Sequence, residues 1–192
     1  PHHHSSAASD VYKRQPHNSH YELSLKTLRS GKHLLCEKPM TMNSTEAMIL
    51  LNEARVNNLF FMEAFMYRCH PLTHKMLEIV KQEFSDQEVL IESSFGFKAD
   101  VTEDHRLKNP ALGGGSILDI GCYPLSMARL IAGNLMGKSF SDPISISASG
   151  NLSSENIDLN AKAEISFNTK IKAIIKSAIN EEYENSLRIK LN

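Results

Sequence analysis

Helical and strand-like patterns alternate between residues 19 and 62, and this alternation restricts the fold more than any other feature of the chain. Residues 19–30 open with a Ser-x-x-Glu capping box and carry apolar side chains at helical spacing, so they predict a helix. Residues 33–36 form a short apolar run typical of a buried strand, Asn43 is placed to cap a second helix, and residues 59–62 repeat the strand pattern. Helix, strand, helix, strand is the order that produces a parallel sheet with right-handed crossovers.

The second part of the chain predicts a different architecture. A helix is expected after Pro71, with apolar side chains on one stripe at Leu72, Met76, Ile79 and Val80. Another helix is expected over residues 116–132. Alternating apolar positions, typical of strands with one buried face, recur in residues 89–98, 144–148, 163–167, 171–178 and 187–191. Asn168 and Thr169 are placed to form a hairpin turn.

We therefore expect an α/β chain with two partial domains. Residues 16–69 are predicted to be the C-terminal part of a doubly wound parallel (Rossmann) domain that binds a dinucleotide. Residues 70–192 are predicted to be part of an α+β domain with an open, mainly antiparallel sheet, used for substrate binding and oligomerisation. Residues 1–15 have no apolar period and are expected to be a non-native or disordered tail. A metal site at His2–His4 is the weaker alternative, because adjacent histidines on such a tail cannot close a coordination sphere.

A doubly wound dinucleotide domain normally opens with a strand and a glycine-rich turn, which lets the pyrophosphate approach a helix N-terminus. No G-x-G-x-x-G occurs in this chain, and only Gly31 and Gly96 precede the triplet Gly113–Gly115. We therefore expect the chain to be an internal fragment of a larger enzyme, inactive by itself.

Composition excludes several classes of partner. The formal net charge of -1 gives no basic surface for nucleic acid or an anionic membrane. No apolar run approaches the roughly 18 residues of a membrane span. Three cysteines without C-x-x-C spacing argue against a disulfide framework and a zinc site, and favour a reducing, cytoplasmic location.

Three residues are candidates for proton chemistry. Lys38 follows the strand of residues 33–36, at the edge where parallel sheets bind ligands. Asp119 and Tyr123 are four positions apart and would share a helix face, although Pro124 is expected to kink that helix. An alcohol gives up a proton as hydride leaves its carbon, and a phenol, whose ordinary pKa is about 10, accepts it near neutral pH only with help from a nearby ammonium. Lys38 and Tyr123 are therefore predicted to act as a couple, with Asp119 orienting the substrate or the lysine.

Each candidate also has a purely structural interpretation. Lys38 could be a solvated residue at a strand end, Asp119 a helix cap, and Tyr123 a core aromatic whose hydroxyl is satisfied. The triplet Gly113–Gly115 could cradle a phosphate, but no Lys-Ser/Thr follows it, so a tight turn that admits substrate is the better hypothesis.

Two arginines, Arg68 and Arg106, are interpreted as anion or interface contacts and not as catalytic groups.

Four segments together resemble the glucose-fructose oxidoreductase, inositol dehydrogenase and rhizopine catabolism (Gfo/Idh/MocA) family. Within that family the chain looks most like the branch of trans-1,2-dihydrobenzene-1,2-diol and D-xylose dehydrogenases, because a tyrosine stands at position 123, where many members have histidine. The resemblance covers nearly everything from residue 16 onward. The segments that carry it are residues 16–20 (PHNSH), 31–39 (GKHLLCEKP), 63–71 (EAFMYRCHP) and 113–124 (GGGSILDIGCYP).

The resemblance implies a role for each matching residue. Lys38 would lie beside the nicotinamide and the reacting hydroxyl, before a cis peptide bond to Pro39. Glu37 and His20 match positions that contact the cofactor, and Asn18 helps to shape the same turn, although His20 could equally just pack in its helix. Asp119 and Tyr123 match the acid and the proton donor or acceptor at the substrate.

The implied activity is hydride transfer between NAD or NADP and a secondary hydroxyl of a sugar, cyclitol or trans-dihydrodiol, with no metal. The partners implied are a polyol or sugar substrate and, for the complete enzyme, a second copy in a homodimer or larger assembly. A glycoside hydrolase of the same fold that uses NAD transiently is one alternative. A non-catalytic binding protein is the other.

Overall fold

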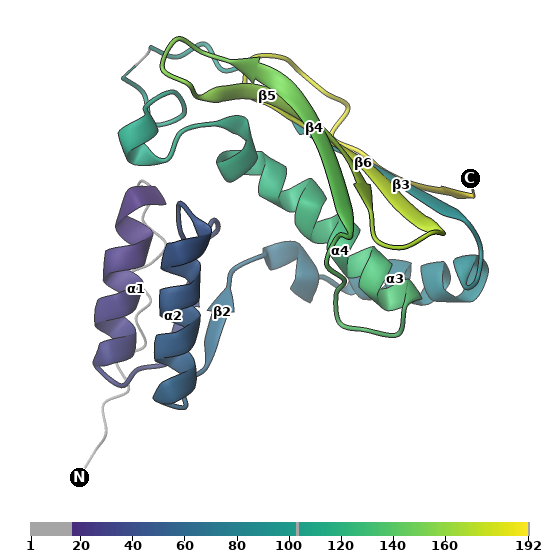
Figure 1. The fold of residues 1–192 in the computed structure, drawn as a ribbon, viewed down its shortest axis with the longest axis horizontal. Coiled ribbons are helices and arrows are strands. Elements are labelled where there is room, and N and C mark those ends of the chain that lie inside the picture. Colours follow the sequence, from purple (N-terminus) through teal and green to yellow (C-terminus); the bar gives the residue numbers. More distant parts are fainter. Residues whose placement is uncertain (1–16, 103, 192) are drawn as a thin grey trace. The chain divides into compact units, whose positions relative to one another are not determined.

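The computed structural model describes residues 17–102 and 104–191, so the prediction for residues 1–15 lies outside the described residues. The chain forms two compact units (Figure 1). The first contains the described residues up to Phe65 together with Ala111–Gly113, and the second contains Met66–Pro110 and the described residues from Gly114 onward.

The first unit has the predicted alternation of helices and strands. Its elements are η2 (His17–Ser19), α1 (His20–Arg29), β1 (Leu34–Cys36), α2 (Ser44–Val56) and β2 (Phe61–Glu63). Strands β1 and β2 pair in parallel, with Leu34 opposite Phe61, so the predicted parallel sheet is confirmed. In Figure 1, α1 and α2 lie side by side, and both pack on the buried side chains of β1.

The two helix starts of this unit have different outcomes. Asn43 caps α2 as predicted, because its side chain accepts a hydrogen bond from the backbone N–H of Glu46. The cap predicted at Ser19 is wrong, since Ser19 makes no side-chain cap hydrogen bond. Ser19 belongs to η2 and already has helical backbone angles, whereas a capping residue needs an extended backbone.

The second unit is built on a five-stranded sheet. Its elements are η3 (Met66–Cys69), α3 (Pro71–Phe84), β3 (Val89–Gly96), η5 (Ile117–Gly121), α4 (Cys122–Leu135), β4 (Ser145–Leu152), β5 (Asp158–Ser166), β6 (Ile171–Ala178) and β7 (Leu187–Leu191), and the turn η4 (Pro110–Leu112) precedes the glycine triplet. The strand order is β4-β5-β6-β3-β7. Only the β3–β6 pair is parallel among the four pairs of this sheet, so the expected mainly antiparallel sheet is confirmed.

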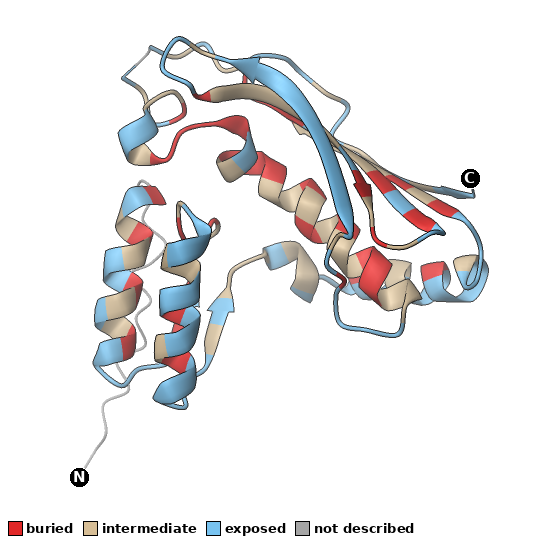
Figure 2. Cartoon of the chain, in the orientation of Figure 1, coloured by how far each residue is buried: buried red, intermediate tan, exposed pale blue. Residues whose placement is uncertain are grey.

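Helices α3 and α4 cover one face of this sheet (Figure 1). Alternate strand residues meet them in a core that includes Val80, Ile91, Ile131, Ile165 and Phe167. The edge strand β4 is exposed along its whole length (Figure 2). The turn between β5 and β6 is the predicted one, because the Asn168 side chain accepts hydrogen bonds from the backbone N–H groups of Lys170 and Ile171.

The predicted apolar stripe of α3 is only partly correct. Leu72 is 71% exposed and Ile79 is 46% exposed, whereas Thr73 and Val80 are buried. Met76 and Val80 pack in the core as predicted, but Leu77 and the buried Thr73 take the places expected for Ile79 and Leu72, so the helix is rotated toward Thr73 and Leu77.

A π-turn precedes Pro124, the proline near which a kink is expected. In η5 the backbone N–H of Cys122 donates to the carbonyl of Ile117, five residues earlier. Single π-turns inside α-helices occur frequently at functional sites. No helix among the described residues has the length and apolar character needed to cross a membrane.

Candidate active site

Lys38 lies in the turn that follows β1 in the first unit. The peptide bond between Lys38 and Pro39 is cis, as the resemblance implied. Glu37 and Lys38 are half-buried and Pro39 is buried. Lys38 is therefore a half-buried residue of this turn, and both interpretations of it, a group for proton chemistry and a strand-end residue, stay open.

Two side chains hold this turn from either side. His20, buried in the first turn of α1, has its Nδ1 at 2.7 Å from the carbonyl oxygen of Pro39. The backbone N–H of Met40 donates to Glu63 Oε1 at 2.8 Å. Because a carbonyl oxygen only accepts, His20 Nδ1 is the donor in this contact. Both hydrogen bonds restrict the backbone of Pro39 and Met40, the residues that directly follow Lys38.

Glu63 was missed as a functional residue by the sequence reasoning. It is the last residue of β2, and β2 pairs directly with β1. The available signal was its position, because polar residues at the C-terminal ends of adjacent parallel strands meet at one edge of the sheet.

A second histidine, His17, was also missed. It is buried, its Nδ1 lies 2.8 Å from the carbonyl oxygen of Gly113, and its ring centroid is 5.9 Å from that of His20. Gly113 has a φ of +74°, and a Cβ there would approach His17 Cβ to 2.8 Å. Asn18, the neighbouring predicted residue, is exposed on η2.

In the second unit, Asp119 forms an ion pair with Arg106. Arg106 Nη1 donates to Asp119 Oδ1 at 2.9 Å, and Asp119 is only 6% exposed. A buried carboxylate is costly unless a charged partner compensates it, and Arg106 supplies that partner. Arg106 is predicted from the sequence to contact an anion, and in the structure that anion is the Asp119 carboxylate.

Tyr123 lies in the first turn of α4 between two aromatic rings. Its ring centroid is 5.8 Å from that of Phe95 and 6.3 Å from that of Tyr67, both tilted. Ser126, three residues after Tyr123 in α4, is a hydrogen-bond partner of both Tyr67 and Arg68. Its hydroxyl oxygen lies 2.8 Å from Tyr67 Oη and 2.9 Å from Arg68 Nη2. The structure thus brings Asp119 and Tyr123 together on one continuous helical segment, with Tyr123 held laterally. Pairing of Lys38 with Tyr123 would join the two units and stays a prediction.

Cys36, the buried cysteine beside the Lys38 turn, is not suited to act as a nucleophile. Burial raises the pKa of the Cys36 thiol, which disfavours the thiolate that nucleophilic chemistry requires. Within residues 17–102 and 104–191, no group of three or more His, Cys, Asp or Glu side chains could hold a metal ion.

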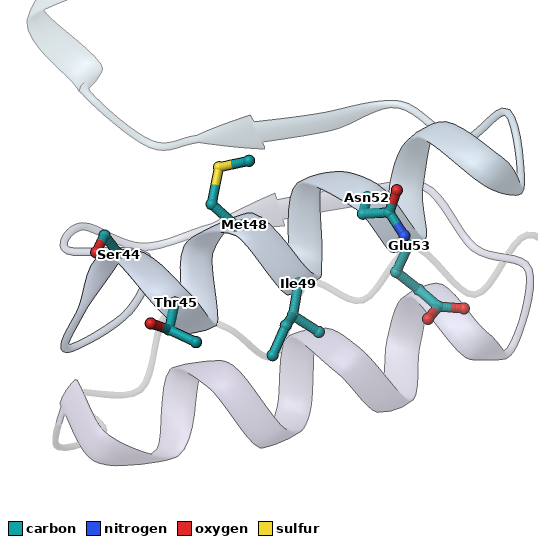
Figure 3. A pocket seen from close by; sticks show the side chains of 6 residues that line it. All are labelled: Ser44, Thr45, Met48, Ile49, Asn52 and Glu53. Carbon is teal, nitrogen blue, oxygen red and sulfur yellow. The ribbon is translucent and has the colours of Figure 1, made fainter.

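A hollow of about 450 Å³ lies along α2 and contains none of the candidate residues (Figure 3). It is lined by Ser44, Thr45, Met48, Ile49, Asn52 and Glu53, all from one helix.

Two family models match the chain. Residues 8–65 match the model described as "Oxidoreductase family, NAD-binding Rossmann fold", and residues 74–192 match the "GFO/IDH/MocA C-terminal domain".

Curated relatives include D-xylose 1-dehydrogenase (NADP(+)) 2 from Haloferax volcanii, which is 39% identical over 124 residues, or 64% of this chain and 38% of the relative. Trans-1,2-dihydrobenzene-1,2-diol dehydrogenase from Xenopus tropicalis is 29% identical over 179 residues, or 93% of this chain and 52% of the relative. The chain thus spans about half the length of the curated relatives it matches, or less.

Among solved structures, a 3-ketoreductase from Actinomadura kijaniata in complex with NADP and TDP-benzene is similar with a TM-score of 0.73 and 25% identity, covering 91% of this chain and 51% of the reductase. Variants of that reductase with a lysine or a tyrosine replaced have also been solved.

Proposed function

The chain belongs to the Gfo/Idh/MocA oxidoreductase family, and we propose that the complete protein transfers hydride between NAD or NADP and a secondary hydroxyl of a sugar, cyclitol or trans-dihydrodiol. The observation that carries this proposal is Lys38, fixed before a cis proline at the C-terminal end of a parallel strand. Such strand ends are where doubly wound sheets bind their ligands. Because the chain spans about half of its curated relatives, the activity is assigned to a protein that also carries a segment corresponding to the rest.

In this proposal Tyr123 exchanges the proton and Lys38 is its electrostatic partner. Oxidation of a carbinol releases a hydride and a proton, and the nicotinamide takes the hydride. The Tyr123 phenol group takes the proton, helped by the Lys38 ammonium, which favours the phenolate.

Asp119 is proposed to orient the substrate or the lysine. Its carboxylate is buried, is compensated by Arg106 and precedes Tyr123 on the same helical segment. Such a group can accept hydrogen bonds from a substrate hydroxyl without changing its own charge. This is the behaviour required of a group that orients a polyol.

The cofactor is proposed to contact Glu37, Lys38, His20 and Asn18. The turn of residues 37–40 is held by His20 and Glu63, and because His20 uses Nδ1 to bind the Pro39 carbonyl, Nε2 is the ring nitrogen left for a ribose or amide group. Relatives named as NADP-dependent support a nicotinamide cofactor.

We further propose that the complete protein is cytoplasmic and forms a homodimer or larger assembly. The free cysteines Cys36, Cys69 and Cys122 fit a reducing compartment. The candidate interface is the sheet face opposite α3 and α4, where β6 presents Lys172, Ile174 and Lys176. Light scattering of the purified complete protein tests this assembly, and a monomer at micromolar concentration would disprove it.

The proposed activity is tested by absorbance at a wavelength where only reduced nicotinamide absorbs. The complete protein is mixed with NAD⁺ or NADP⁺ and a panel of aldoses, cyclitols and trans-dihydrodiols. Reduction is expected with at least one of these substrates, and Lys38→Ala and Tyr123→Phe are each expected to lower turnover by about a hundredfold, the scale of acid/base groups. Cleavage of nitrophenyl glycosides without net nicotinamide reduction would instead identify an NAD-using glycoside hydrolase, and bound cofactor without either reaction a binding protein.

A further inference from the structure

A carboxylate from the sheet caps the helical segment that carries Asp119 and Tyr123. Asp158, the first residue of β5, accepts two hydrogen bonds at Oδ2: one at 2.7 Å from the backbone N–H of Ile117 and one at 2.8 Å from the Ser116 hydroxyl. Ile117 is the first residue of η5, so this carboxylate satisfies an N–H that has no partner inside the helix. A negative charge at this end also interacts favourably with the helix dipole. Capping this helical segment was considered as a structural role for Asp119. In the structure Asp158 of β5, 39 positions further along the chain, supplies the cap.

A second sheet residue, Ser177 of β6, completes the arrangement. Ser116 Oγ lies 2.9 Å from Ser177 Oγ, and the two serines are 0% and 3% exposed. A hydroxyl has one proton to donate, and Ser116 donates its own to the Asp158 carboxylate. Ser177 is therefore the donor in the bond between the serines. The three side chains form a directed chain of hydrogen bonds that ends on Asp158.

Two glycines are required by these side chains. A Cβ on Gly115 would lie 2.2 Å from Asp158 Oδ1, and the φ of Gly115 is +114°. A Cβ on Gly121 would lie 2.9 Å from Ser177 Oγ. The segment from Gly115 to Gly121 is thus seated directly against Asp158 at one end and Ser177 at the other. Asp119 lies between these glycines, four residues after Gly115 and two before Gly121.

We propose that Asp158 and Ser177 are positioning residues that set the placement of the Asp119 carboxylate and the Tyr123 phenol in the active site. This inference rests on the proposed function, because it assigns Asp158 and Ser177 to the reaction attributed to Asp119 and Tyr123. Neither residue contacts the substrate: both act through η5. A π-turn is rare and occurs mostly as a single turn inside an α-helix. We infer that the contacts which Asp158 and Ser177 make from outside the helix fix the position of this one. Asp158 supplies the charged contact and Ser177 supplies the neutral one.

The first test is independent of catalysis and uses the chain as it stands. Hydrogen exchange of the peptide covering residues 115–123 is compared between the parent chain, Asp158→Asn, Asp158→Ala and Ser177→Ala. Asp158→Ala is expected to speed exchange in this peptide by about tenfold, and the other two by about threefold, with α3 peptides unchanged. Asp142→Ala is the matched control, because Asp142 pairs with Arg129 of α4 but lies 75% exposed and away from η5. Unchanged exchange of residues 115–123 in Asp158→Asn and Ser177→Ala would overturn the proposal, whether or not Asp158→Ala folds.

The second test uses the complete protein and separates positioning from a general loss of structure. In Asp158→Asn, kcat per folded enzyme is expected to fall about tenfold or more. The dissociation constant of the reduced cofactor that the parent uses, NADH or NADPH, is read from nicotinamide fluorescence and should change less than about twofold. Asp142→Ala is expected to change neither quantity. Equal kcat in Asp158→Asn and the parent would refute the positioning role. An inactive parent would refute the proposed function instead, while the exchange experiment would still decide whether Asp158 and Ser177 hold η5.

Discussion

Replacing Gly115 by alanine tests the contact between the glycine triplet and Asp158 most severely. Gly115 has a φ of +114°, and a Cβ there would lie 2.2 Å from Asp158 Oδ1. The substitution therefore adds two costs. Positive φ costs a residue with a side chain about 1–3 kcal/mol. Displacing the carboxylate also loses its hydrogen bonds to Ile117 and Ser116, each worth about 1.5–3 kcal/mol because the acceptor is charged.

Together these costs predict a loss of about 4 kcal/mol or more in the free energy of unfolding. Gly137→Ala is the matched control, because Gly137 also has a positive φ, +69°, but nothing lies within 4 Å of a Cβ there. That control should lose only about 1 kcal/mol. With a urea m-value of about 2 kcal/mol/M, the difference corresponds to a shift of more than about 1 M in the midpoint.

The assay is urea unfolding followed by far-UV circular dichroism, in which the five-stranded sheet and α4 supply the signal of the second unit. The double variant Gly115→Ala with Asp158→Ala should lose less free energy of unfolding than the sum of the two single losses. Both substitutions remove the same hydrogen bonds, and without the Asp158 carboxylate the Cβ at position 115 no longer clashes with it. If Gly115→Ala and Gly137→Ala cost the same within about 0.5 kcal/mol, Asp158 does not press on the triplet, and the reasoning is refuted.

Three further predictions concern residues away from η5. Glu63→Gln removes the charge from the acceptor of the Met40 N–H and should destabilise the first unit by about 1 kcal/mol in urea unfolding. The control Glu155→Gln, at an exposed turn, should have no effect. Equal urea midpoints for the two variants would show that the Glu63 charge does not stabilise the turn of residues 37–40. Exposed Cys69 should react with a thiol reagent at least about tenfold faster than Cys36, whose burial raises its thiol pKa, and mass mapping that finds Cys36 modified first would contradict this. Burial, and the hydrogen bond that Tyr183 donates to Glu181, raise the pKa of Tyr183 to about 12 from 10.0 in the unfolded chain. The contribution of Tyr183 to the free energy of unfolding is therefore complete below pH 10 and lost as the pH rises to about 12. Spectrophotometric titration of the parent chain and of Tyr183→Phe can check this. A parent chain whose tyrosines all titrate near pH 10 would contradict it.

The elements of this fold were predictable where their signals are local. Asn43 caps α2 because its partner, Glu46, is three residues away, and the parallel pairing of β1 with β2 follows from the short helical crossover between them. The rotation of α3 was not predictable, because Leu72 and Thr73 both continue a helical stripe and only the sheet selects between them. Ser19 failed as a cap because the preceding residues are already helical, which no pattern around it indicates.

The candidate site divides in the same way. The motifs located Lys38, Asp119 and Tyr123, and the cis bond at Pro39 is confirmed. The residues that hold them were not found, since Glu63 contacts Met40 across 23 positions and Asp158 contacts Ser116 across 42. Such contacts depend on the register of strands that pair far along the chain. Sequence therefore identified the groups proposed for the chemistry, and the structure was needed to find what positions them.

The central claim is that hydride passes from a substrate carbon to a nicotinamide. The most direct measurement uses a substrate deuterated at the reacting carbinol carbon, incubated with the complete protein and NAD(P)⁺, followed by mass spectrometry of the nicotinamide product. One deuterium per molecule of reduced cofactor is predicted, at a rate that falls about a hundredfold in Tyr123→Phe. Deuterium that stays on the sugar product while the cofactor remains oxidised would contradict the account.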